Sequence, residues 1–351
     1  MAYSSIVKPS VYFNTKLYTG NGGTNAITGV GFQPDFNWLK NRSNTGEHIL
    51  VDAVRGMYNI RSNSTTAQSA NGSSHQQSLD SDGFTVAGTG ANSNANGNTF
   101  ASWNWKANGA GSANTDGSIN TTATSVNTTA GFSISSYTGT GSNATVGHGL
   151  GVAPKMIIIK STSNTSNWGV YHKSIGANKM LNLNTTAAEA TNSGYFNNTD
   201  PTTTVFSLGD EGNDTNGSGK NYIAYCFAEK TGYSKFGSYV GNGNANGAFV
   251  YTGFKPAFIL QKRTNSASTG WGMFDSTRSP TNVSQNMILA NSNAVEDTSA
   301  AGAIDFLSNG FKWRTADGWF NGGGDPNIYM AFAEEPLVSN SGTDGVPATA
   351  R

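Results

Sequence analysis

The sequence predicts an all-β protein made of three tandem antiparallel β-units, each sandwich-like or jelly-roll-like, in a pseudo-threefold arrangement. Glycine fills 44 of the 351 positions while only 12% of residues are charged, and such a composition is rich in turns. Apolar runs are short and end at Gly, Asn or Pro, which is typical of strands. One set of landmarks also recurs three times in the same order. A propeller-like or barrel arrangement of the units is the alternative.

The composition and the charge balance exclude several classes of protein. Aromatic residues reach 11%, which separates the chain from disordered sequences. The 21 basic and 21 acidic residues cancel, so nucleic acid is not an expected partner. No run approaches the ~20 apolar residues of a membrane span, and the N-terminus lacks the basic and apolar regions of a secretory signal. We therefore expect no membrane insertion, and assembly in a cytoplasm.

Two landmarks define the start of each unit. The first is a tyrosine followed by a Gly-x-Gly turn, and the second is a proline followed by a short apolar strand that ends in lysine. The distance from the tyrosine to the lysine differs by at most one residue between the units, which a Gly-rich composition alone does not produce. The repeat-defining residues are Tyr18, Pro34 and Lys40, then Tyr137, Pro154 and Lys160, then Tyr239, Pro256 and Lys262.

The next landmark is a strand-like run that carries charged or aromatic pairs. Asp52 and Arg55 in the first unit have the same spacing as Asp275 and Arg278 in the third, and an arginine can fork onto a carboxylate. We interpret each pair as a local clamp, with contact to a ligand as the alternative. Each unit then passes through a strand centred on a phenylalanine and ends in an aromatic closing strand. The phenylalanines are Phe84, Phe206 and Phe311, and the closing strands are 100–105, 222–227 and 328–333.

These landmarks divide the chain into five parts. They are an N-terminal segment with the first unit (1–107), a Gly-, Ser-, Asn- and Thr-rich linker (108–129), the second unit (130–229), the third unit (230–335) and a C-terminal tail (336–351). Residues 156–159 and 222–227 are predicted core strands, with Cys226 as a small buried strand residue. The only helix candidates are 65–70 and 185–190, whose Thr-Thr-Ala openings suit a single capped turn.

The sequence offers no convincing set of residues for catalysis, for a cofactor or for a metal. A hydrolase needs a paired acid and base, or a nucleophile with a His and an orienting acid. His148 and His172 change residue type at the matching positions of the other units, which favours structural roles. The Gly-x-Gly triplets lack the Lys-Ser/Thr of a phosphate loop. The stretch 209–217 offers oxygen ligands that suit calcium, but it lacks the spacing of a calcium loop.

Trp319 and Phe320 are the candidate contacts for a glycan or for a protein partner. They lie in a short loop between Gly318 and Asn321, where we expect both rings to be exposed. Exposed rings stack on the faces of sugars, and neighbouring amides bond their hydroxyl groups.

Parts of all three units resemble one protein family. Residues 13–36, 145–155 and 251–254 combine aromatic, Pro and Gly positions in a fixed order. In this they resemble a family of uncharacterised virion structural proteins of marine bacteriophages, often described as tail-fibre-like. The resemblance extends over nearly the whole chain and brings no catalytic residues. It implies a non-enzymatic protein on the virion surface, assembled in the host bacterial cytoplasm. The partners it implies are capsid or tail subunits, with a bacterial surface glycan as a candidate receptor.

Two other functions stay open at this point. A capsid head-decoration protein would use its three similar units to contact neighbouring capsid subunits, and the lack of a shaft-like or heptad segment fits that function. A particle-borne polysaccharide hydrolase would need two carboxylates that face each other in a cleft, ~5–10 Å apart.

Overall fold

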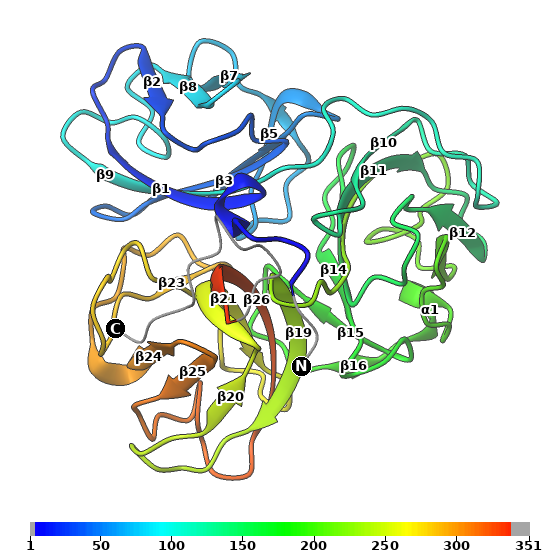
Figure 1. Ribbon diagram of the computed structural model, residues 1–351. Helices are drawn as coiled ribbons and strands as arrows, with labels where there is room; N and C mark the ends of the chain where they lie inside the picture. Colours follow the sequence, from blue (N-terminus) through cyan, green and yellow to red (C-terminus); the bar gives the residue numbers. More distant parts are fainter. Residues whose placement is uncertain (1–3, 338–351) are drawn as a thin grey trace.

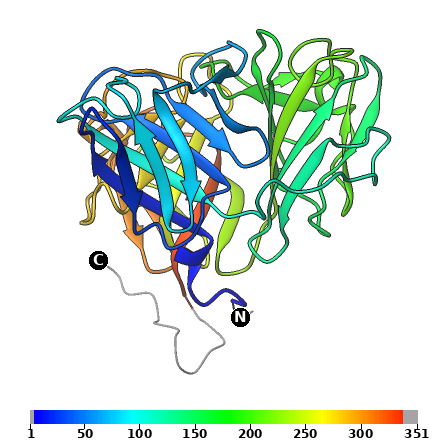
Figure 2. The same ribbon diagram turned by 90° about the horizontal axis from the view of Figure 1, so that it is seen from above.

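The computed structural model describes residues 4–337, and within this range the chain consists of β-strands joined by turns. Its helical segments are a short α-helix, α1 (Ser193–Phe196), and two 3₁₀ turns, η1 (Pro9–Val11) and η2 (Ala300–Gly302). Figure 1 shows three lobes around a common centre, and Figure 2 shows lobe 1, in blue and cyan, beside lobe 2, in green. We call residues 13–105 lobe 1, residues 123–227 lobe 2 and residues 234–336 lobe 3. The prediction of an all-β fold with antiparallel sheets is confirmed.

Lobe 1 packs a large antiparallel sheet against a small one. The small sheet has three strands, in the order β2 (Asn25–Thr28), β8 (Gly83–Ala87) and β7 (His75–Asp80). The large sheet has six strands, in the order β1 (Phe13–Thr19), β9 (Thr99–Trp105), β3 (Phe36–Asn41), β4 (Ile49–Asp52), β5 (Gly56–Ile60) and β6 (Ser69–Ala70).

Lobe 2 follows the same plan with one more strand in its large sheet. The small sheet pairs β12 (Ala144–Gly147) with β17 (Val205–Leu208). The large sheet has seven strands, in the order β10 (Ala123–Asn127), β11 (Phe132–Thr138), β18 (Asn221–Phe227), β13 (Met156–Ser161), β14 (Trp168–His172), β15 (Lys179–Asn182) and β16 (Ala190–Thr191).

Lobe 3 completes the molecule. Its small sheet has three strands, in the order β20 (Phe249–Tyr251), β25 (Gly310–Trp313) and β24 (Ile304–Leu307). Its large sheet has five strands, in the order β19 (Ser234–Val240), β26 (Pro326–Pro336), β21 (Phe254–Arg263), β22 (Gly272–Asp275) and β23 (Ile288–Leu289).

The three large sheets share one strand order. In each, the strand that carries the repeated tyrosine pairs with the closing strand, and the closing strand pairs with the strand that ends in the repeated lysine. The internal sequence repeat and the threefold symmetry stay predictions, which a superposition of the three lobes tests.

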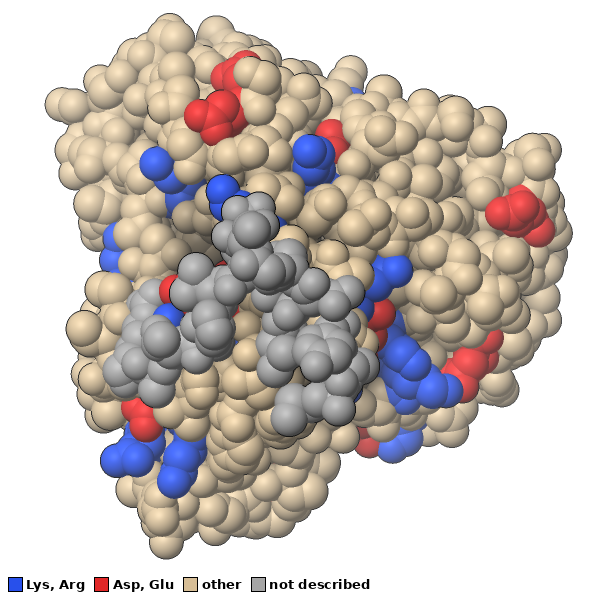
Figure 3. Space-filling model, viewed as in Figure 1, with Lys and Arg blue, Asp and Glu red and all other residues tan. Residues whose placement is uncertain are grey.

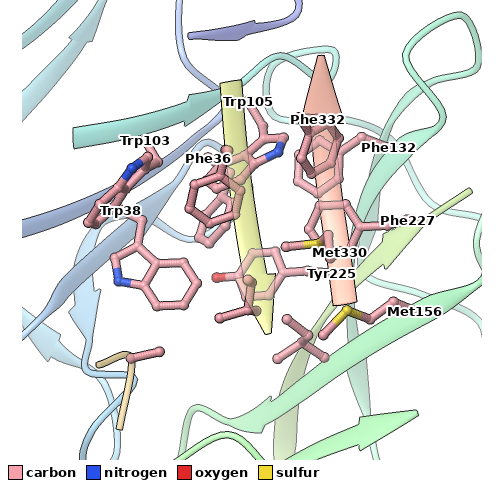
Figure 4. Close-up of a cluster of buried hydrophobic side chains, with 14 of the residues drawn as sticks. Phe36, Trp38, Trp103, Trp105, Phe132, Met156, Tyr225, Phe227, Met330 and Phe332 are labelled. Carbon is pink, nitrogen blue, oxygen red and sulfur yellow. The ribbon is translucent and has the colours of Figure 1, made fainter. Parts of the chain in front are cut away.

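A central hydrophobic cluster joins the lobes. It takes side chains from the inward faces of all three large sheets, among them Phe36, Tyr225 and Phe332, as Figure 4 shows. The rings of Phe36 in lobe 1 and Tyr225 in lobe 2 stack with their centroids 4.3 Å apart, and those of Phe13 and Phe332 stack at 5.1 Å. Such ring pairs contribute stability beyond the area that they bury. The lobes therefore share one core.

Each lobe also has a second cluster between its large and small sheets. Along β13, Met156 and Ile158 belong to the central cluster while Ile157 and Ile159 belong to the outer cluster of lobe 2. Successive strand residues point to opposite faces, and here both faces are covered. This double burial explains the continuous apolar runs, and it confirms 156–159 and 222–227 as core strands.

The two helix candidates are wrong. Residues 65–68 and 186–189 form no helix, and each run leads into a two-stranded pairing at β6 or β16. The reason is tertiary: the backbone N–H of Gln68 donates to Thr162 O of lobe 2, and that of Glu189 donates to Thr264 O of lobe 3. A backbone group that bonds a neighbouring lobe is not available for a helical turn.

The predicted linker is also corrected. Residues 108–122 pack against lobe 2, where Ile119 enters the outer cluster, and β10 forms an edge of the large sheet. The strand was missed because its buried side chains are hydroxylic: Thr124 Oγ1 and Ser135 Oγ lie 3.1 Å apart in a hydrogen bond. Most of the predicted tail, residues 338–351, lies outside the described residues.

Candidate functional site

The repeated lysines lie at the junctions between lobes. The amino groups of Lys40, Lys160 and Lys262 are buried, and burial lowers the pKa of each from 10.5 to about 8. Each donates to the backbone carbonyl of the next residue in its own strand. Each also donates to a carbonyl of another lobe, in the segment that follows β5, β15 or β23; we call this segment the arm of that lobe. The acceptors in the arms are Asn293 O for Lys40 at 3.4 Å, Thr65 O for Lys160 at 3.2 Å and Thr186 O for Lys262 at 3.3 Å.

The charged pairs that we predicted as clamps are present, and they also connect lobes. Arg55 Nε lies 2.6 Å from Asp52 Oδ2, and Arg278 Nε bonds Asp275 Oδ2. The same two carboxylates accept a hydrogen bond from the next lobe around the centre. His172 occupies the matching position in lobe 2. The contacts across the junctions are Tyr225 Oη to Asp52 Oδ2 at 2.7 Å, Trp103 Nε1 to Asp275 Oδ2 at 3.0 Å and His172 Nε2 to Tyr329 O at 3.2 Å.

In each lobe a side-chain ring nitrogen also bonds a backbone carbonyl of the preceding lobe around the centre. The ring belongs to a residue at or just before the start of β4, β14 or β22. Sequence reasoning had singled out none of these residues as a junction contact. The contacts are His48 Nε2 to Leu289 O at 3.1 Å, Trp168 Nε1 to Arg61 O at 3.0 Å and Trp271 Nε1 to Asn182 O at 3.0 Å. Lobe 1 is thus tied to lobe 2, lobe 2 to lobe 3 and lobe 3 back to lobe 1. These polar residues close a ring of junctions.

The tyrosine and the Gly-x-Gly turn of each lobe hold the loop that precedes the closing strand. Each tyrosine hydroxyl donates to a backbone carbonyl of the loop before the closing strand. The residue after that carbonyl is a buried asparagine, whose Oδ1 accepts a backbone N–H of the Gly-x-Gly turn. The turn and the loop approach so closely that the first glycine has no space for a side chain: a Cβ on Gly20 would lie 2.2 Å from Ala95 O. The carbonyls are Ser93 O for Tyr18, Thr215 O for Tyr137 and Phe320 O for Tyr239, and the asparagines are Asn94, Asn216 and Asn321.

Sequence reasoning missed these asparagines, although a signal existed. Their distance to the closing strand differs by at most one residue between the lobes. The repeated prolines have a simpler place: Pro34 and Pro154 are buried just before β3 and β13, and Pro256 lies within β21 where its pairing with β26 is irregular.

The histidines considered for catalysis form hydrogen bonds within the fold. His148 and His172 are buried, and each accepts a backbone N–H at Nδ1 and donates from Nε2 to a carbonyl. Burial lowers the pKa of both, that of His172 to about 4. His75 Nδ1 lies 3.0 Å from Ser93 Oγ, the arrangement of a base and a nucleophile. Ser93 is fully buried, however, so its hydroxyl is not open to a substrate.

In residues 209–217, the stretch considered for calcium, Glu211 and Asp214 accept hydrogen bonds from other groups of lobe 2. Glu211 accepts hydrogen bonds from the backbone N–H groups of Asn213, Asp214 and Thr215, and Asp214 accepts from Asn167 and Tyr195. Among residues 4–337 no group of three or more His, Cys, Asp or Glu side chains is placed to hold a metal ion. Cys226 is a buried free thiol on β18, as predicted, and burial raises its pKa.

Phe320 and Trp319 have different surroundings. Phe320 is only 1% exposed and stacks on Trp313 in the outer cluster of lobe 3, so its expected role as an exposed contact is wrong. Its carbonyl accepts the Tyr239 hydroxyl, which draws the residue inward. Trp319 is half-buried and lines a pocket of about 210 Å³. The other lining residues are Met287, Leu289, Ala294, Val295, Asp297, Ala301, Asp317 and Phe320.

The surface carries few charges. On the face drawn in Figure 3, basic and acidic residues are sparse and interspersed, and no broad patch of one sign is seen. No helix within the described part of the chain has the length and apolar character needed to cross a bilayer.

Comparison with known proteins assigns a family. A family model described as "Domain of unknown function (DUF7483)" matches residues 8–336, which includes all three lobes. A search of curated proteins gives no match.

Proposed function

The chain belongs to the DUF7483 family, which has no assigned function, and from this premise we propose that it is a non-enzymatic structural protein displayed on the surface of a bacteriophage particle. Its role there is that of a tail-fibre-like attachment or appendage component. Its partners are other virion proteins.

One observation carries the proposal: the repeated polar side chains join the lobes. Lys40, Lys160 and Lys262, with the acids and rings of the strands beside them, bond across the junctions. An enzyme needs such groups at a cleft where a substrate can reach them. A displayed structural protein instead needs a rigid body whose variable loops face outward, and a shared core with three tied junctions supplies that rigidity.

The resemblance of residues 13–36, 145–155 and 251–254 to virion proteins of marine phages supports the particle location. The low proportion of charged residues, 12%, and the turn-rich surface also suit an exposed particle component.

A capsid head-decoration protein is the second candidate, and the arrangement of the lobes favours it. Three lobes of similar strand order surround one centre in Figure 1. Symmetric assemblies present equivalent surfaces around their axes, so one such chain can contact three neighbouring capsid subunits at once.

Cryo-electron microscopy of purified particles of a phage that encodes this chain tests the proposal. We expect a three-lobed density of this size on the particle, and peptides of the chain in the mass spectrum of the same particles. Density at the tail supports the attachment role, and density at a threefold position of the capsid supports decoration. Particles that contain neither the density nor the peptides overturn both versions.

A further inference from the structure

We propose that the pocket beside Trp319 in lobe 3 binds a single sugar ring. The choice of a bacterial surface glycan as the source of that ring rests on the proposed function. The fit between the pocket and a sugar does not.

The other two lobes have a different kind of residue at the position of Trp319. The residue before each carbonyl that accepts the repeated tyrosine is Asn92 in lobe 1, Asp214 in lobe 2 and Trp319 in lobe 3. Asn92 Oδ1 accepts from Glu47 N at 2.8 Å, and Asp214 Oδ1 accepts from Asn167 N at 2.6 Å, so both side chains close a loop. An indole cannot accept these bonds. Its ring lines the pocket instead.

The walls of the pocket are held in place. One wall is the arm of lobe 3, which carries Val295, and this arm is tied to lobe 1 on both sides of that residue. Gly46 N donates to Asn293 O at 2.9 Å, and Glu296 N donates to Arg42 O at 3.0 Å. The side chains of Arg42 and Glu296 form an ion pair at 2.8 Å. A site whose walls are fixed before binding loses little entropy when a ligand enters.

The pocket offers two kinds of surface. Trp319, Leu289 and Val295 supply apolar surface, and Val295 is 45% exposed. Asp297 and Asp317 supply carboxylates, and in each the Oδ1 atom accepts a backbone N–H, from Ser299 and Trp319 respectively. Within the described residues the Oδ2 atom of neither carboxylate has a hydrogen-bond or ion-pair partner.

A sugar ring satisfies both surfaces. Ionised carboxylates accept hydrogen bonds and donate none, so the ligand must bring donors. A pyranose has an apolar C–H face for the indole and the aliphatic side chains, and hydroxyl groups at its edge for the two Oδ2 atoms. The volume of about 210 Å³ is below the roughly 300–1,000 Å³ of sites for drug-sized ligands, which limits the occupant to about one ring. The two carboxylates also disfavour phosphate and other anions.

The test uses the full chain and the methyl glycosides of glucose, galactose, mannose and N-acetylglucosamine as probes. Saturation-transfer NMR detects binding, and titration gives the affinity. We expect at least one glycoside to bind, and Trp319→Ala to weaken it at least tenfold. Asp297→Asn and Asp317→Asn keep an acceptor for the backbone N–H, and we expect each to weaken binding several-fold. Tyr251→Ala, which removes a half-exposed ring elsewhere on lobe 3, is the control and should leave the affinity unchanged.

Thermal unfolding shows whether each variant is folded, and the Asp→Asn variants keep the test decisive if Trp319→Ala is not. The proposal is overturned if no glycoside binds, or if binding survives both the tryptophan and the two aspartate substitutions. It is also overturned if Nα-acetyl-lysine methyl ester binds and the glycosides do not, because the pocket then serves a basic peptide. A negative result leaves the particle location intact, since microscopy and mass spectrometry test that separately.

Discussion

The carboxylate of Asp275 connects lobe 3 to lobe 1, and its replacement by leucine tests whether the junctions hold the molecule together. Asp275 and Arg278 form an ion pair with no exposed side-chain area, and Trp103 Nε1 of lobe 1 donates to the same carboxylate at 3.0 Å. Asp275→Leu leaves Arg278 with Glu296 at 2.7 Å as its remaining carboxylate partner and leaves the indole N–H without one. Breaking a buried pair from one side costs about 3–5 kcal/mol, so we expect a loss of that size in the free energy of unfolding.

Equilibrium unfolding in guanidinium chloride, followed by tryptophan fluorescence and far-UV circular dichroism, measures this loss. Arg314→Gln is the matched control, because Arg314 is 43% exposed and lies 3.6 Å from Asp305. Exposed pairs contribute only about 0–1 kcal/mol. If Asp275→Leu costs no more than the control, the junction contacts do not hold the lobes together and the reasoning is refuted.

Three further predictions follow from the junctions and the turns. Burial holds the pKa of Lys160 at about 8, below the 10.5 of the unfolded chain. Between these pH values the unfolded state binds more protons than the folded state, so stability rises with pH. Lys160→Met should flatten the rise measured by denaturation at pH 8.0–9.5, and an unchanged slope would contradict the assignment. Gly139→Ala should destabilise the protein, because the new Cβ would lie 2.5 Å from Gly217 O, whereas Gly212→Ala meets no atom within 4 Å and should be nearly neutral in the same assay. Residues 123–229 expressed alone should lack a cooperative thermal transition, because their central-cluster face is left in water; a sharp transition would show that the lobe folds independently.

The fold class and the core strands could be predicted because they depend on local pattern. Four consecutive apolar residues at 156–159, bounded by Pro154 and Lys160, identify a strand that is covered on both faces. The pattern of apolar residues did not identify a strand whose buried side chains are polar. Thr124 and Ser125 on β10 are buried through hydroxyl hydrogen bonds, so a buried strand has the composition of a loop.

The junctions could not be predicted for a different reason. Their acceptors are largely backbone carbonyls, such as Thr65 O, Asn182 O and Tyr329 O, and a carbonyl leaves no trace in residue type. The repetition of Lys40, Lys160 and Lys262 indicated a shared role but not which surface the amino groups meet. Trp319 and Phe320 were both expected to be exposed, because loop composition did not distinguish the half-buried Trp319 from the buried Phe320 beside it.

The three junctions differ at one equivalent position, and this difference disfavours one exchange of lobes. A phenol meets a carboxylate at Asp52, an imidazole meets a peptide oxygen at His172 and an indole meets a carboxylate at Asp275. If lobe 3 replaced lobe 2 beside lobe 1, Asp52 would face the backbone oxygen of Tyr329. Two hydrogen-bond acceptors would then meet with no hydrogen between them. Such a mismatch is expensive when buried. This contact therefore disfavours an exchange of lobe 3 for lobe 2 beside Asp52.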